Sequence, residues 1–279
     1  MRRGSSLLAI ATTVGALGAV VVSSPAAAVP GLVYVTFTSA TNSSDKVGST
    51  ICPDGTVSVG GGASITGGNG QVTIQELLPA IALGKPVLVV VAEEDADGYA
   101  GNWSLTTVNA CIPRPAGFRY VSNNASGPGP VTVTAQCVGQ QIIGGGFRVL
   151  THTAKVMATG IDLALDRASL TAEPSPLPGG VTPITGIVTA ACADAALPGM
   201  VQSVASTPLS SSNPQTVTAT CPAGTQIIHV GGGLLGSRTH SVIDDLGMTP
   251  PNLAVVTGYE DQVGNPNNWA VQSVATCAT

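Results

Sequence analysis

A pattern of cysteine, glycine triplet and second cysteine occurs three times in this chain and constrains its fold more than any other feature. The copies run from Cys52 through Gly60–Gly62 to Cys111, from Cys137 through Gly144–Gly146 to Cys192, and from Cys221 through Gly231–Gly233 to Cys277. The triplets are in register with the cysteines, which recur about every 80 to 85 residues, as in a chain of internal repeats. The sequence therefore predicts three copies of one unit, at about residues 32–112, 118–193 and 200–278.

Each copy has the pattern of antiparallel β-strands. Segments 131–137 and 216–221 alternate apolar and polar residues before the first cysteine, so one strand face is expected inside and the other in solvent. Turn residues follow that cysteine, and a second strand then runs into the glycine triplet. Glycines inside a strand indicate a β-bulge or the close approach of another backbone. No helix start signal and no lysine of a phosphate-binding loop follows a triplet, which excludes that reading.

An alternating strand closes each copy and carries the second cysteine. Trp103 and Trp269 stand eight residues before that cysteine, where copy two has Ile184. Only size and apolarity are common to tryptophan and isoleucine, so we expect core positions rather than sugar-stacking surfaces.

The N-terminus has the pattern of an export signal. Arg2 and Arg3 precede an uncharged, mostly apolar stretch over 7–22, and small residues ending at Ala28 follow. This order predicts a signal peptide over residues 1–28. The apolar run is short and broken by glycine for a spanning helix, and no later stretch is long enough to span a bilayer. We therefore expect a secreted or cell-envelope protein whose residues 29–279 form a single β domain with no membrane span.

Six cysteines in an exported chain indicate disulfides, and fifteen pairings are possible. Because each copy holds one early and one late cysteine, the simplest solution is one bridge inside each copy, joining its first and last strands. That solution pairs Cys52 with Cys111, Cys137 with Cys192, and Cys221 with Cys277. A zinc site does not fit, because there is no C-x-x-C and no histidine close to a cysteine.

Three similar β units predict an all-β fold with pseudo-threefold symmetry. The short links between copies favour a β-prism, with three Greek-key sheets around an axis, over a three-bladed propeller-like array or a row of three small sandwiches.

The turn Cys52-Pro53-Asp54-Gly55, its counterpart over 221–224 and the closing cysteines resemble those of the vitelline membrane outer layer protein I family. That resemblance implies a threefold β-prism of disulfide-bearing repeats. The chain also resembles uncharacterised secreted actinobacterial proteins with Cys-Pro-Ala-Gly and Gly-Gly-Gly repeats. Both resemblances imply an extracellular coat or carbohydrate-associated role rather than a defined reaction.

The amino-acid composition argues against two classes of binding partner. The chain carries a net charge of −5, and only 9% of its residues are charged. Nucleic acids and anionic membranes are recognised by basic patches, so an acidic, lysine-poor chain argues against both.

Acidic segments follow an apolar strand in copies one and three, shortly before each tryptophan. Asp162 and Asp166 are a looser match in copy two. Asp244 and Asp245, in copy three, form a separate cluster. Such segments either solvate loops, bind calcium or sugar hydroxyls, or supply a glycosidase pair. His152 and His240 follow the glycine-bearing strands and are expected in solvated loops. The candidate ligand-binding residues are Glu93, Glu94, Asp95, Asp97, Tyr99, Tyr259, Glu260 and Asp261.

No catalytic motif and no cofactor are predicted, although calcium would suit the acidic segments. The sequence favours a non-enzymatic protein that binds extracellular or cell-wall polysaccharide. A structural envelope protein without a small ligand is the alternative, and a polysaccharide hydrolase is a third hypothesis that rests on the acidic segments alone.

Overall fold

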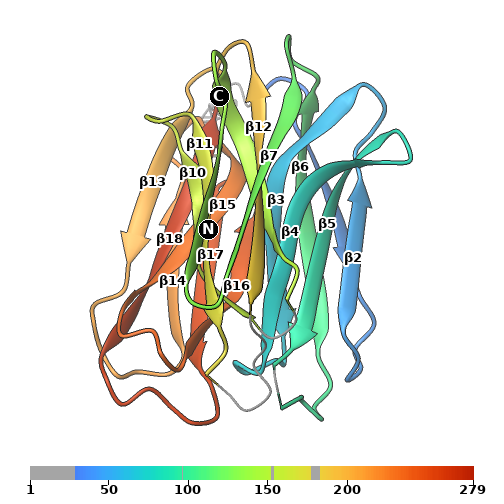
Figure 1. The fold of residues 1–279 in the computed structure, drawn as a ribbon. Coiled ribbons are helices and arrows are strands. Elements are labelled where there is room, and N and C mark those ends of the chain that lie inside the picture. The colour runs from blue at the N-terminus through green and yellow to red at the C-terminus, as the bar shows by residue number, and fades with distance from the viewer. Residues whose placement is uncertain (1–28, 96, 152–153, 177–182) are drawn as a thin grey trace, which may run out of the picture.

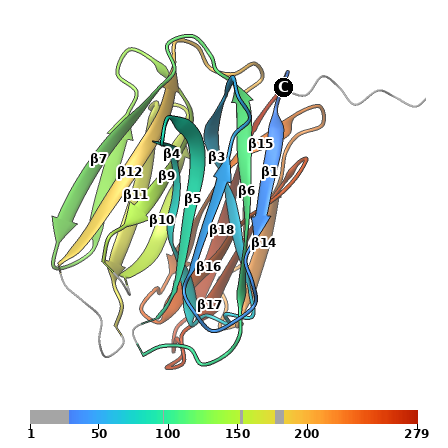
Figure 2. The same cartoon turned by 90° about the vertical axis from the view of Figure 1, so that its right-hand side faces the viewer.

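The structure, a computed structural model, describes residues 29–95, 97–151, 154–176 and 183–279; the expected signal peptide and His152 lie outside these ranges. The described residues form eighteen β-strands and no helix. Three six-stranded antiparallel sheets stand around a common axis and enclose the core (Figures 1 and 2). This confirms the predicted all-β, prism-like fold of three pseudo-symmetric repeats.

Each repeat supplies six strands. The first repeat contains β1 (Val33–Thr38), β2 (Lys46–Ile51), β3 (Thr56–Thr66), β4 (Val72–Ala82), β5 (Lys85–Glu94) and β6 (Ser104–Pro113). The second contains β7 (Arg119–Gly127), β8 (Val131–Gln136), β9 (Gln141–Val149), β10 (Ala154–Asp162), β11 (Arg167–Pro174) and β12 (Ile184–Ala193). The third contains β13 (Val201–Ser206), β14 (Gln215–Thr220), β15 (Gln226–Gly236), β16 (Ser241–Thr249), β17 (Leu253–Glu260) and β18 (Trp269–Ala278).

Every sheet is built from two repeats. The strand orders are β1-β6-β3-β16-β17-β14, β7-β12-β9-β4-β5-β2 and β13-β18-β15-β10-β11-β8. The first, sixth and third strands of one repeat thus form a sheet with the fourth, fifth and second strands of another. Nothing in the sequence pattern indicated this exchange, because a repeat reveals which segments are alike but not which copy they pair with.

The two halves of each sheet meet at a glycine. There the third strand of one repeat runs so close to the fourth strand of the other that an added β-carbon would lie 2.1 to 2.8 Å from a carbonyl oxygen. The glycines and the residues whose carbonyls they face are Gly62 and Leu246, Gly146 and Leu77, and Gly231 and Thr159. The predicted close approach of another backbone is therefore present at all three junctions.

The strand register corrects the expected alignment of the triplets. Gly62, Gly146 and Gly231 all pair with the residue three positions before the closing cysteine. The first glycine of the third triplet thus matches the last glycine of the other two. The two positions before the junction glycine, which are glycines in copies one and two, are His229 and Val230 in copy three.

The disulfides are those that the repeat predicts, but they join different strands. Cys52, Cys137 and Cys221 directly follow the second strand of their repeat, because an additional strand precedes the ones recognised in the sequence. Their partners lie in β6, β12 and β18, which belong to other sheets. Each bridge therefore fastens one sheet of the prism to another.

We predict that Gly146→Ala lowers the free energy of unfolding by at least about 2 kcal/mol, because overpacking of a rigid backbone contact has no cheap relief. The added β-carbon would lie 2.1 Å from the carbonyl oxygen of Leu77. Urea unfolding of the oxidised chain measures the loss. Gly129→Ala is the matched control, since nothing lies within 4 Å of a β-carbon there. Equal effects of the two changes would contradict the prediction.

Replacing Cys137 and Cys192 together by alanine should lower the free energy of unfolding by about 4 kcal/mol on the chain-entropy model. The bridge closes a sequence separation of 55 residues and is buried. Urea denaturation of the wild-type and double-variant chains at one temperature gives the difference. A loss below about 1 kcal/mol would mean that the sheets hold together without this bridge.

Candidate functional site

The acidic segments of repeats one and three occupy the same turn at one end of the prism. Asp95 follows β5 and Asp261 follows β17, and in each turn the residue three positions later is a glycine with positive φ whose amide donates to the aspartate carbonyl. The donor–acceptor distances are 3.1 Å for Gly98 and 3.0 Å for Gly264. Both acidic segments therefore lie on the same loop of their units.

Two of the candidate acids anchor the buried tryptophans. The indole nitrogen of Trp269 donates to Glu260 Oε1 at 2.9 Å, and that of Trp103 donates to Glu94 Oε1 at 3.5 Å. Both indoles are fully buried, which confirms them as core residues. Repeat two has Ile184 at the tryptophan position, and its strand β11 ends with Pro174 where β5 and β17 end with glutamate. The acid is thus absent in the repeat that has no indole to accept from.

Two further candidates also hold the fold. The hydroxyl of Tyr99 donates to the carbonyl of Gly67 at 2.7 Å, and its amide donates to Glu94 Oε2 at 3.0 Å. The side-chain amide of Gln262 donates to both carboxylate oxygens of Asp97, which links the turns of repeats one and three.

The remaining two candidates lie on strands. Tyr259 precedes Glu260 within β17, so it is not the structural counterpart of Tyr99. Burial, together with the nearby Asp244 and Asp245 carboxylates, raises the pKa of Tyr259. Glu93 pairs with Thr73 across β5 and β4, beside a shallow pocket.

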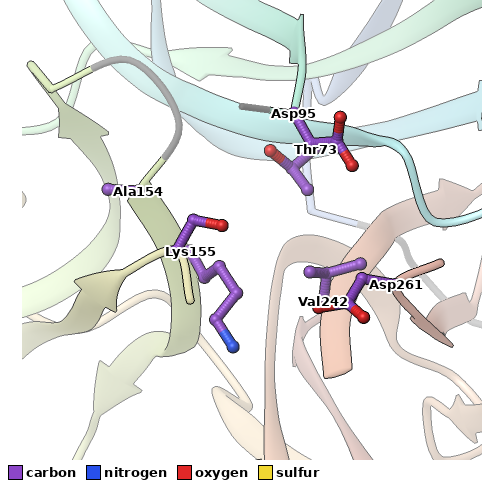
Figure 3. A pocket seen from close by; sticks show the side chains of 7 residues that line it. Thr73, Asp95, Ala154, Lys155, Val242 and Asp261 are labelled. Carbon is purple, nitrogen blue, oxygen red and sulfur yellow. The ribbon is translucent and has the colours of Figure 1, made fainter. Parts of the chain in front are cut away.

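A small pocket lies where the three repeats converge at this end (Figure 3). Thr73, Lys155 and Val242 line it from the second position of β4, β10 and β16. Asp95, Ser175 and Asp261, the residues that follow β5, β11 and β17, complete the wall with Ala154. Since each repeat contributes the same two positions, the pocket lies on the pseudo-threefold axis.

Lys155 joins two repeats beneath this pocket. Its ammonium group donates to the carbonyl oxygens of Thr239 at 2.7 Å and Arg238 at 3.0 Å, and pairs with Glu173 at 3.3 Å. Burial lowers its pKa, which Glu173 and Asp261 partly offset. Because its ammonium protons are donated to carbonyl oxygens of repeat three, Lys155 holds the two repeats together and is not placed to act as a nucleophile.

The two aspartates of the pocket differ in their environment. Asp261 is buried, accepts the amide proton of Val263 at 3.0 Å and pairs with His240 Nδ1 at 2.8 Å. His240 is therefore a hydrogen-bond partner of Asp261 and not the freely solvated loop residue expected. Both carboxylate oxygens of Asp95 are buried and have no hydrogen-bond partner among the described residues. Burial and the neighbouring Asp97 raise the pKa of Asp95 to about 7.

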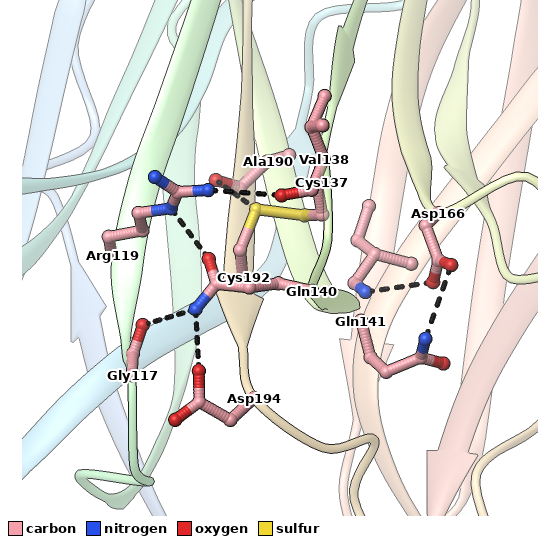
Figure 4. The surroundings of a disulfide bond; sticks show 11 residues. Gly117, Arg119, Cys137, Val138, Gln140, Gln141, Asp166, Ala190, Cys192 and Asp194 are labelled. Carbon is pink, nitrogen blue, oxygen red and sulfur yellow. Dashed lines mark hydrogen bonds between the residues drawn. A yellow bond between two sulfur atoms is a disulfide. The ribbon is translucent and has the colours of Figure 1, made fainter.

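The acids of repeat two lie elsewhere. Asp162 and Asp166 belong to the β10–β11 hairpin at the opposite end, so they are not counterparts of the acidic turns. Figure 4 shows Asp166 beside the Cys137–Cys192 bridge, where its carboxylate accepts the amide proton of Ile142 at 3.1 Å. Asp244 and Asp245 lie inside β16, where burial raises the pKa of both.

These surroundings limit the chemistry of the pocket. No group of three or more histidine, cysteine or acidic side chains is placed to hold a metal ion in the part of the chain that the structure describes. The pocket offers one carboxylate with free acceptor capacity, which suits a hydroxyl or another hydrogen-bond donor. Thr73, Lys155 and Ser175 were missed by sequence reasoning, because only the strand register reveals that they share the axis with Asp95.

Protein-family models and curated proteins contain no match to this chain. The resemblance to the vitelline membrane outer layer protein I family and to actinobacterial repeat proteins therefore stays a prediction. The described residues include no helix that is long and apolar enough to cross a bilayer. Three closed disulfides point to an oxidising environment.

We predict that Glu260→Ala lowers the free energy of unfolding by about 1 to 3 kcal/mol, because it leaves a buried indole N–H without an acceptor. Glu94→Ala should also lower it, because that change removes both the 3.5 Å bond from Trp103 and the 3.0 Å bond from the Tyr99 amide. Thermal unfolding followed by near-ultraviolet circular dichroism measures both. Unchanged stability of both variants would show that these acids do not support the tryptophans.

Proposed function

We propose that this chain is an exported, non-enzymatic β-repeat protein that binds a polysaccharide of the cell wall or extracellular layer at the pocket on its axis. Export is supported by the N-terminal pattern over 1–28 and by the three disulfides. The protein is expected to act in the extracellular space or cell envelope, without a cofactor.

The single observation that carries the proposal is the state of Asp95. Among the described residues it is the pocket carboxylate whose two buried oxygens have no partner within hydrogen-bonding geometry, with Asp97 and the amide of Gly98 as its polar neighbours. Buried polar atoms of folded proteins are nearly always hydrogen-bonded, so such an exception needs a reason. The space in the pocket is only about 10 Å³, enough for one hydroxyl or water, so a single sugar hydroxyl donating to Asp95 would supply the missing partner beside Thr73 and Ser175.

An envelope protein with a purely structural role is the second candidate. Glu94, Glu260, Tyr99 and Asp97 all make contacts that hold the fold. Each would otherwise have been available to a ligand. The sheets fastened to one another by disulfides would also serve a load-bearing layer.

We predict that, above pH 7 where Asp95 is charged, Asp95→Asn weakens binding to purified cell-wall polysaccharide about tenfold or more, because a hydrogen bond to a charged group contributes about 1.5 to 3 kcal/mol. Asparagine keeps the size of the side chain. Co-sedimentation with insoluble wall and glycan fractions, with and without calcium, is the measurement. Asp54→Asn is the control, since Asp54 is exposed at the opposite end of the prism and pairs with Lys85.

The possible results separate the candidates. Binding that Asp95→Asn weakens and Asp54→Asn leaves unchanged supports the pocket. Binding that survives Asp95→Asn places the ligand on another surface. Absence of binding to every fraction favours the structural role.

A further inference from the structure

The three third strands place corresponding residues together near the axis. Gly60 on β3, Gly144 on β9 and His229 on β15 all pair with the residue directly before the closing cysteine of their repeat. A β-bulge precedes each of them, so the three positions are structurally equivalent. Two repeats thus supply glycine where the third supplies a histidine.

The imidazole of His229 fills space beside Gly60, one of these glycines. A β-carbon at Gly60 would lie 2.7 Å from His229 Nδ1, and one at Gly144 would lie 1.7 Å from the carbonyl oxygen of Val59. His229 is only 2% exposed. The ring is therefore buried against the backbone of repeat one at Gly60, where a second side chain would not fit.

Neither ring nitrogen of His229 has a hydrogen-bond partner among the described residues. A neutral imidazole tolerates this at some cost, but an imidazolium would place an unsolvated charge in the core. Burial alone lowers the pKa of His229, to about 4.

No acid compensates a charge at this position. Of the strands packed against β15, the described residues of β3, β6 and β18 carry no titratable side chain apart from the disulfide cysteines. The titratable groups on the others are Arg148 on β9, Lys155 and Asp162 on β10, Asp244 and Asp245 on β16, and Tyr259 and Glu260 on β17. Tyr34 also reaches this layer, through a hydrogen bond to the carbonyl of Ile227. None of these groups shifts the pKa of His229.

We propose that His229 is an acid-sensitive latch on the axis: the three repeats stay packed around it only while its ring is neutral, and proton uptake opens the fold. Protonation of His229 would act on the stability of the fold itself, so this proposal is independent of ligand binding at Asp95.

The direction of the effect follows from linkage between protonation and folding. The pKa of His229 is about 4 in the folded chain, against 6.5 for an ordinary histidine, so the unfolded chain binds the proton more tightly. This contribution to stability is complete above pH 6.5 and is lost as the pH falls toward 4. Carboxyl groups whose pKa burial raises, such as Asp244 and Asp245, act in the opposite direction. They are present in wild type and variant alike, so a comparison of the two isolates the histidine.

The experiment compares urea unfolding of the oxidised wild-type chain and of His229→Leu between pH 7 and pH 4. Leucine keeps an apolar side chain of similar volume and removes the titration. The ratio of the wild-type to the variant unfolding constant should rise by nearly tenfold per pH unit below 6.5 and reach about 150-fold at pH 4. His240→Leu is the matched control, because His240 pairs with Asp261 and should not remove this acid sensitivity. Parallel stability curves for wild type and His229→Leu would overturn the proposal.

A second measurement decides the question if His229→Leu does not fold. Ring signals of the wild-type histidines are followed by NMR during acid titration, with His240→Leu used for assignment. The latch requires that His229 stays neutral while native signals persist and becomes protonated only as they disappear. A native-state titration near pH 6.5 would exclude it.

Discussion

The close approach of neighbouring backbones at three glycines is the contact on which the rest of the structure depends. At each junction the third strand of one repeat meets a carbonyl of the fourth strand of another, and no β-carbon fits between them. The paired stretches there are short, with a single paired residue between β16 and β3. Few hydrogen bonds cross a junction, so close packing of the two backbones holds the strands together there. Elsewhere in these sheets, long hydrogen-bonded ladders do so. Van der Waals contact at such distances is lost steeply when the backbones separate.

The disulfides complement these junctions. A junction joins two repeats within one sheet, whereas a bridge joins two sheets through a single repeat. The two kinds of connection alternate around the prism and close it into a ring. With only 3% aromatic residues, the chain has few large side chains to fill a core, and the buried Trp103 and Trp269 are accordingly held by acceptors as well as by packing.

The repeat, the β class and the cysteine pairing could be predicted because each rests on residues that recur at a constant spacing. The exchange of half-sheets between repeats could not be predicted, because similar copies carry no signal of which other copy their strands pair with. The acidic turns were located correctly. The sequence does not show, however, that Glu94 and Glu260 accept hydrogen bonds from the buried tryptophans and so support the fold. Lys155 and His229 escaped notice for a related reason: each acquires its importance from residues more than 50 positions away, which only the register brings together. Comparing the repeats strand by strand, rather than triplet by triplet, would have shown that His229 stands where two copies have glycine.

The sharing of sheets has a consequence for how such a chain can arise. A lone repeat would leave two half-sheets, each with an unsatisfied inner edge, and could bury them only against two further copies of itself. The same architecture could form from three one-repeat chains, and the present protein carries the three repeats in one polypeptide. Because repeats of one chain need not be identical, one copy can carry a histidine where the other two carry glycine, and its ring lies beside one of these, Gly60.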